Sequence, residues 1–127
     1  MFKDVDCVHL RVANLEDGLA FYRDMLGLRM LWKTDVACGL GTENGSTEIV
    51  LSTKDLTAID LKVDNVKDAL NKFVEAGGRI LDGPFDIDVG KCAVVADPWG
   101  NEYCLLDTIK GTYDTDADGL VNGVSKK

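Results

Sequence analysis

Four ionisable side chains lie inside otherwise apolar stretches of this 127-residue chain: His9, Glu48, Asp60 and Glu102. A carboxylate buried without a partner is costly, so such groups indicate either a function or an ion pair. An imidazole and three carboxylates that converge on one point can hold a divalent ion, and so many oxygens favour Mn²⁺ or Mg²⁺ slightly over Zn²⁺. The structural alternative is an ion pair: Arg11 and Lys62 each stand two residues beyond one of these groups and could neutralise the carboxylates without a metal.

The elements that must position these residues repeat along the chain. Residues 8–15 match residues 59–66 at an offset of 51, aliphatic on aliphatic and asparagine on asparagine. The match continues without a gap as far as a glycine in each copy. The offset makes His9 equivalent to Asp60, so the chain is predicted to contain two copies of one structural unit.

Each copy is predicted to form a strand, a helix and three further strands. Alternation with period two indicates opening strands near residues 5–13 and 57–64. Asn14 and Asn65 are good N-caps for the helices that follow, whose apolar residues recur at helical spacing: Leu15, Leu19, Tyr22 and Leu26, then Val66, Leu70, Phe73 and, more weakly, Val74. The later strands are predicted at 28–34, 36–41 and 46–52, and at 79–87, 91–96 and 102–107.

The predicted fold class is therefore α+β, with two βαβββ modules in one domain. The modules cover about residues 5–52 and 57–109, so the domain spans 1–109. Residues 110–127 are expected to form an acidic, solvated C-terminal extension. Residues 114–119 resemble the first half of a calcium loop, but Ser125 stands where such a loop needs glutamate.

Two local strings give this architecture a family resemblance. The first joins the strand VHLRV at 8–12 to the helix end FYRDMLGL at 21–28, and the second is the turn DPWGNEY at 97–103. In this order, and with the internal repeat, they resemble the vicinal oxygen chelate superfamily of glyoxalases, bleomycin resistance proteins and dioxygenases. The resemblance covers roughly residues 5–109.

The resemblance implies that each module curls its sheet into half of a cup, with its helix on the convex side. Strand alternation then places two apolar sets under the helices: Val8, Leu10 and Val12, and Ile59, Leu61 and Val63. The opposite faces would line the cup, where Cys7 and Cys104 are expected as small packing residues, with soft metal ligation as the alternative. Those faces also include the four ionisable residues, at the positions where metal-binding members of the family place their ligands: His9, Glu48, Asp60 and Glu102.

The leading functional hypothesis is a glyoxalase-like lyase or isomerase that acts on a small oxygenated compound. A divalent metal, whether Mn, Mg, Ni or Zn, would polarise the substrate oxygens, and Glu48 or Glu102 would transfer the proton. The chain departs from the pattern at Asp60, where such members usually have His or Gln. Because His9 is the only histidine, ring-cleaving dioxygenase chemistry and fosfomycin-type thiol transfer are excluded. The alternative is a metal-free protein of the bleomycin-resistance type that sequesters an antibiotic or another ligand.

Five further residues are candidates for contact with this small-molecule ligand: Arg11, Trp32, Lys62, Phe85 and Trp99. Trp99 lies in the predicted turn, where an indole ring would form a platform for a planar ligand. Trp32 and Phe85 occupy comparable regions of the two modules and could form apolar walls.

Composition limits the partners. A net charge of −8 argues against nucleic acid and anionic membranes, and no apolar run is long enough for a membrane helix. The N-terminus does not resemble a secretory leader, and the four scattered cysteines fit a reducing cytoplasm. Because two modules leave sheet edges and the cup rim uncovered, a homodimer is expected.

Overall fold

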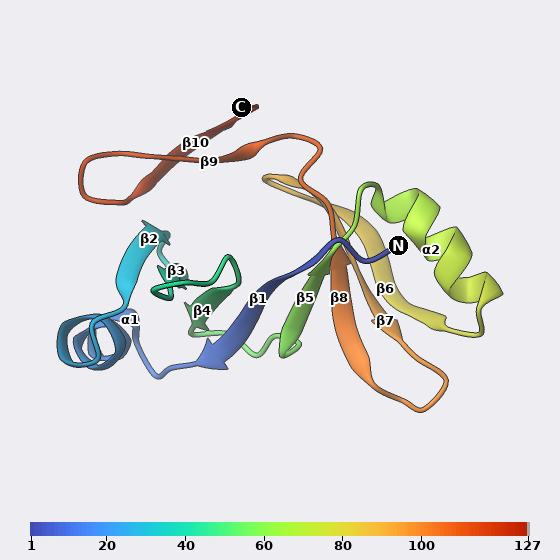
Figure 1. Ribbon diagram of the computed structural model, residues 1–127, viewed down its shortest axis with the longest axis horizontal. Coiled ribbons are helices and arrows are strands. Elements are labelled where there is room, and N and C mark those ends of the chain that lie inside the picture. Colours follow the sequence, from blue (N-terminus) through green and yellow to red (C-terminus); the bar gives the residue numbers. More distant parts are fainter. Residues whose placement is uncertain (127) are drawn as a thin grey trace.

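The computed structural model describes residues 1–126 and contains a curved sheet, helices on its outer side and a C-terminal hairpin (Figure 1). The first module consists of β1 Asp4–Arg11, α1 Leu15–Leu19, a π-helical continuation η1 Ala20–Met25, β2 Arg29–Lys33, β3 Ala37–Gly41 and β4 Glu48–Ser52. The second consists of β5 Ile59–Lys62, α2 Val66–Glu75, β6 Arg79–Ile87, β7 Gly90–Ala96 and β8 Glu102–Leu106. The α+β fold with two βαβββ modules is confirmed.

The modules join through their opening strands. The sheet has eight strands in the order β2-β3-β4-β1-β5-β8-β7-β6, and β1 pairs antiparallel with β5 at the seam. Each opening strand also pairs in parallel with the last strand of its own module, β1 with β4 and β5 with β8. Cys7 therefore lies opposite Glu48 on one side and Asp60 on the other, so side chains from both modules meet at the seam.

Both helices begin as their sequences predict. The side-chain oxygens of Asn14 and Asn65 accept the backbone N–H groups of Asp17 and Asp68, at 2.8 and 3.1 Å. The end of the first helix differs, because Leu26 N donates to Phe21 O in the wider π pattern. Leu26, at the end of this wider turn, points away from the core and is 58% exposed.

The outer face of the seam corrects the prediction that six strand residues lie under the helices. Val12, Leu61 and Val63 do pack into the two module cores. Leu10 and Ile59, however, are exposed. The reason is placement: α1 packs on β4, and α2 packs on β6 and β7, so the helices leave uncovered the parts of β1 and β5 where Leu10 and Ile59 stand.

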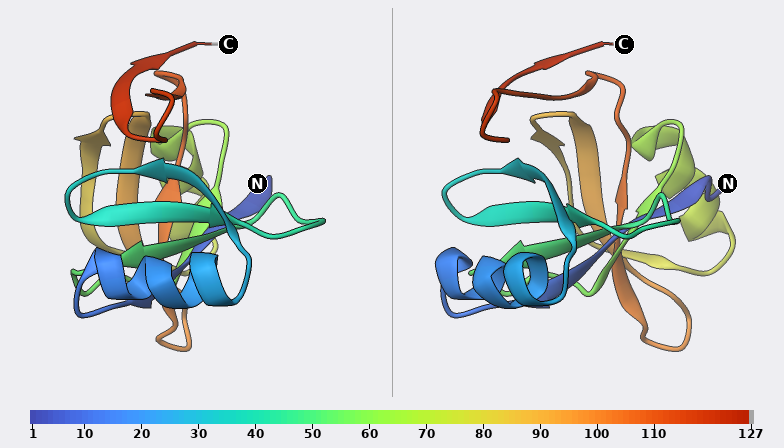
Figure 2. Two further views of the ribbon diagram at one scale, coloured as in Figure 1. Left: turned by 90° about the vertical axis from the view of Figure 1, so that its left-hand side faces the viewer. Right: turned by 60° about the vertical axis from the view of Figure 1, so that its left-hand side comes forward.

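The C-terminal residues also differ from expectation. They are largely exposed, but they form a hairpin of β9 Thr112–Thr115 and β10 Val121–Ser125, which crosses the open side of the cup (Figures 1 and 2). The calcium-loop resemblance is explained by a turn, because Asp116 uses one side-chain oxygen to accept the N–H groups of Asp118 and Leu120. Among the described residues no helix has the length and apolarity needed to span a bilayer.

Candidate functional site

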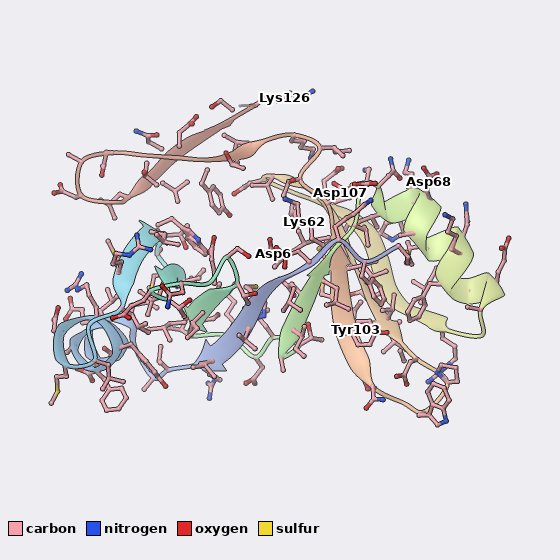
Figure 3. All side chains as sticks on the ribbon, viewed as in Figure 1. Asp6, Lys62, Asp68, Tyr103, Asp107 and Lys126 are labelled. Atoms are coloured by element: carbon pink, nitrogen blue, oxygen red, sulfur yellow. The ribbon has the colours of Figure 1, made fainter. Side chains whose placement is uncertain are left out.

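A cavity of about 640 Å³ lies on the concave side of the sheet, beneath the hairpin. Five of the predicted site residues line it: His9, Trp32, Glu48, Asp60 and Lys62. Figure 3 shows Asp6 and Lys62 directed into the space between the sheet and the hairpin. The cavity therefore lies where the two modules and the C-terminal segment meet.

Three side chains at the seam bring potential metal-ligating atoms together. Cys7 and His9 are alternate residues on one face of β1, and β5 places Asp60 opposite Cys7. Cys7 Sγ lies 3.6 Å from His9 Nε2 and 3.4 Å from Asp60 Oδ2, and the latter two atoms are 3.6 Å apart. The three atoms form a nearly equilateral triangle at the floor of the cavity.

This triangle fits a tetrahedral metal ion. With metal–ligand distances of ~2.3 Å for sulfur and ~2.0 Å for nitrogen and oxygen, tetrahedral ligands are roughly 3.3–3.6 Å apart. The His9 ring is already oriented, because Nδ1 donates to the Thr57 carbonyl at 2.8 Å and leaves the Nε2 lone pair free. Burial raises the pKa of Cys7 and of Asp60. A bound cation would counter both effects and hold the two groups ionised.

Glu48 lies beside this cluster and has a different partner. Its Oε1 accepts the Trp32 indole N–H at 2.6 Å. Gly39 makes this contact possible, since a Cβ there would collide with both side chains. Burial raises the pKa of Glu48, the Trp32 hydrogen bond opposes that shift, and the negative charge of Asp6 adds to it.

The two cations expected to neutralise the predicted carboxylates do not pair with them. Arg11 Nε lies 3.2 Å from an oxygen of Asp55, and both side chains are exposed. Lys62 lines the cavity, and its charge lowers the pKa of Asp6 against the effect of burial. Within residues 1–126 neither cation pairs with any of the three predicted carboxylates. The ion-pair explanation of the cluster is therefore wrong.

Four predicted residues lie outside the cavity lining: Arg11, Phe85, Trp99 and Glu102. Glu102 is exposed at the start of β8, two residues before Cys104, the first residue of that strand to pair with β5. Phe85 belongs to β6, the outermost strand of its module, and Trp99 is 84% exposed in the turn between β7 and β8. All three therefore lie too far along or across the sheet to reach the seam.

Among the polar cavity residues, Asp6 and Tyr113 were not predicted, and Cys7 was expected chiefly as a packing residue with metal ligation as the alternative. The strand face that Cys7 shares with His9 is the signal that favours ligation. Asp6 could not have been recognised, since a β-bulge between Val5 and Cys7 breaks the alternation and places neighbouring residues on the cavity side. Tyr113 belongs to the hairpin, where its ring centroid lies 5.2 Å from that of Trp32.

Sequence comparison identifies the family of the chain. Residues 5–105 match the family model described as the Glyoxalase/Bleomycin resistance protein/Dioxygenase superfamily. The chain belongs to this superfamily. None of the curated proteins searched matches the chain.

Solved structures of the superfamily share the fold at low sequence identity. A hypothetical protein from Bacillus halodurans is 16% identical, with a TM-score of 0.69 over 87% of this chain and 98% of its own. Methylmalonyl-CoA epimerase from Mycobacterium tuberculosis is 14% identical, with a TM-score of 0.68 over 84% of this chain and 88% of its own. Homoprotocatechuate 2,3-dioxygenase from Brevibacterium fuscum is 22% identical, with a TM-score of 0.63 over 84% of this chain and 37% of its own.

Proposed function

We propose that this protein is a metal-dependent lyase or isomerase that acts on a small oxygenated substrate in the cup. The observation that supports it is the triangle of Cys7 Sγ, His9 Nε2 and Asp60 Oδ2, whose edges fit a tetrahedral site with its fourth position open to the cavity. A thiolate ligand favours Zn²⁺ over Mn²⁺ or Mg²⁺. The proposed ligand set therefore replaces the oxygen-rich set expected from sequence, with Cys7 in place of Glu48 and Glu102.

The chain's own residues provide the remaining chemistry. When bound, Zn²⁺ would supply Lewis acidity that polarises a substrate oxygen. Glu48 Oε1 is held by Trp32, so Oε2 is free to take a proton from the carbon beside a substrate carbonyl and return it. Its raised pKa makes the carboxylate a better base than an exposed glutamate. Lys62 is the cavity cation that can bind a substrate oxygen as negative charge develops on it.

Hydrogen exchange tests this proposal. Protein loaded with Zn²⁺ is incubated in D₂O with dihydroxyacetone or α-hydroxyacetophenone, and loss of the proton signal beside the carbonyl is followed by NMR. Wild type should exchange faster than solvent alone, and Glu48→Gln should lose at least about tenfold of that rate while still binding metal. Glu102→Gln is the matched control and should exchange like wild type. Solvent-rate exchange by wild type would contradict the proposal.

A second candidate is a metal-free binding protein, and the charge of the cavity favours it. The lining contains Asp4, Asp6, Glu48 and Asp60 against Lys62 and one histidine. Such a surface would attract a cationic ligand. This candidate predicts that Zn²⁺ leaves the melting temperature unchanged, whereas the metal-dependent enzyme gains stability by mass action.

We further propose that the protein is a homodimer. Exposed apolar residues on the outer face of the seam support this, namely Val5, Leu10 and Ile59, which are 40%, 38% and 39% exposed. Their strands pair at the seam, so these side chains form one apolar surface between the two helices. A second copy of the chain would cover it.

A further inference from the structure

The C-terminal hairpin β9–β10 belongs to the cavity although it lies beyond the family match. That match ends at residue 105, whereas the hairpin begins at Thr112. Residues Gly111, Thr112, Tyr113 and Thr115 nevertheless line the cavity. The hairpin leaves the second module and reaches β2 of the first, so it spans the mouth of the cup (Figures 1 and 2).

A few hydrogen bonds hold the hairpin at its base and at its tip. At the base, Lys110 N donates to Val89 O at 2.9 Å, and the buried Asp107 accepts Ile109 N. At the tip, Lys33 N donates to Gly119 O at 2.9 Å. None of the hairpin residues that the structure describes is a member of the core clusters. Such a segment can open without unfolding the sheet.

The hairpin contacts the cavity wall through an aromatic pair. The rings of Tyr113 and Trp32 are 5.2 Å apart at an interplanar angle of 45°. Both line the cavity, and the hydrogen bond from Trp32 to Glu48 fixes the indole ring. Two tilted rings present two aromatic faces to a ligand, which favours flat, unsaturated molecules over puckered, saturated ones.

We infer that the hairpin is a lid that selects planar, unsaturated ligands, and that Tyr113 is its ligand-contacting residue. The substrate class that follows is an aromatic or conjugated carbonyl compound. The carbonyl oxygen of this class rests on the proposed metal site, whereas the planar part rests on the aromatic pair alone.

Two hydroxyketones with identical oxygens test the selection. α-Hydroxyacetophenone has a flat phenyl ring, and its cyclohexyl analogue has a puckered one. Binding is measured by calorimetry to Zn²⁺-loaded Glu48→Gln protein, in which turnover is slowed. The phenyl compound should bind about tenfold more tightly than the cyclohexyl compound, the size expected for one aromatic contact. Adding Tyr113→Ala should remove that preference, whereas Trp99→Ala, which deletes an exposed aromatic ring outside the cavity, should preserve it.

A pair of glycine variants tests the lid. Gly119 and Gly100 both have positive φ, 82° and 87°, so Gly119→Val and Gly100→Val strain the backbone alike. Strain at position 119 acts on the tip contact itself, since Lys33 N donates to Gly119 O, whereas position 100 lies in the turn between β7 and β8, outside the cavity lining. Gly119→Val should therefore loosen the tip and weaken binding of the phenyl compound, and Gly100→Val should leave binding unchanged.

The outcomes separate this inference from the proposed function. Equal affinity for the two hydroxyketones, binding of neither, or a preference that survives Tyr113→Ala would overturn the inference. The proposed function is tested independently by Co²⁺ absorption in the same proteins, since Tyr113 and Gly119 lie outside the proposed ligand set. An intact cobalt spectrum without ring preference refutes only the lid, and an absent cobalt spectrum refutes the metal site.

Discussion

Replacing Asp107 should destabilise the protein more than replacing any exposed carboxylate. Asp107 is completely buried between the end of β8 and the chain that leads to the hairpin. Its Oδ2 accepts the N–H of Val66, the first residue of α2, at 2.8 Å, and its Oδ1 accepts the N–H of Lys91 at 3.0 Å. One side chain thus links a helix N-terminus, β7 and the base of the hairpin.

The expected loss follows from these contacts. A hydrogen bond to a charged group contributes about 1.5–3 kcal/mol, and Asp107→Ala removes the bonds from Val66 N and Lys91 N and a longer one from Ile109 N at 3.4 Å, which leaves buried N–H groups unpaired. We therefore expect the free energy of unfolding to fall by about 3–5 kcal/mol. Asp107→Asn keeps one acceptor oxygen and turns an amide donor towards the other N–H, so about half of that loss is expected.

Urea denaturation measures this effect by linear extrapolation. The control is Asp64→Ala, because that side chain is 80% exposed and its ion-pair partner is an exposed lysine. The control should change stability by less than about 0.5 kcal/mol. If Asp107→Ala lost less than about 1 kcal/mol, the assigned role of the carboxylate would be wrong.

Three further predictions concern the site and the assembly. Burial raises the pKa of Glu48 above 4.5, so above that pH the folded state binds more protons than the unfolded state, and wild type loses stability as pH rises. In EDTA, Glu48→Gln should therefore gain stability relative to wild type towards neutral pH. If the urea midpoints of the two proteins changed with pH in parallel, this prediction would be wrong. Glu102→Gln should leave metal affinity unchanged in a calorimetric titration, because Glu102 is exposed outside the cavity. Light scattering at micromolar concentration should give a mass twice the 13.8 kDa of one chain. Leu10→Lys places a charge in the apolar outer face and should reduce the measured mass to that of the monomer. A monomeric wild type would refute the dimer.

The internal repeat predicted the fold because both copies obey the same local rules. Period-two strands, asparagine caps and terminal glycines specify each module without reference to the other. The exposed Leu10 and Ile59 show the limit of this reasoning, since alternation identifies the two faces of a strand but not which part of a face a helix covers. That depends on where α1 and α2 pack, which is a property of the whole sheet.

The site was predicted in part, for a related reason. His9 and Asp60 could be paired from the offset of the repeat, and both line the cavity. Glu102 is the counterpart of Glu48, because each glutamate stands two residues before the partner of the equivalent residues His9 and Asp60. Glu102 nevertheless precedes the first pair between β5 and β8, which is a matter of register. The hairpin was missed because the C-terminal residues have few apolar side chains, and its position depends on backbone contacts such as that from Lys33 to Gly119.

Titration of the metal-free protein with Co²⁺ tests the central claim most directly. Cobalt substitutes for zinc in tetrahedral sites, and a thiolate ligand gives a charge-transfer absorption in the near ultraviolet. Wild type should show this band at one equivalent of Co²⁺, and Cys7→Ser should abolish it. Cys38→Ser, which changes another buried cysteine that lies in the first module's core, should preserve it. A wild type without the band, or a band that survives Cys7→Ser, would contradict a metal centre built from Cys7, His9 and Asp60.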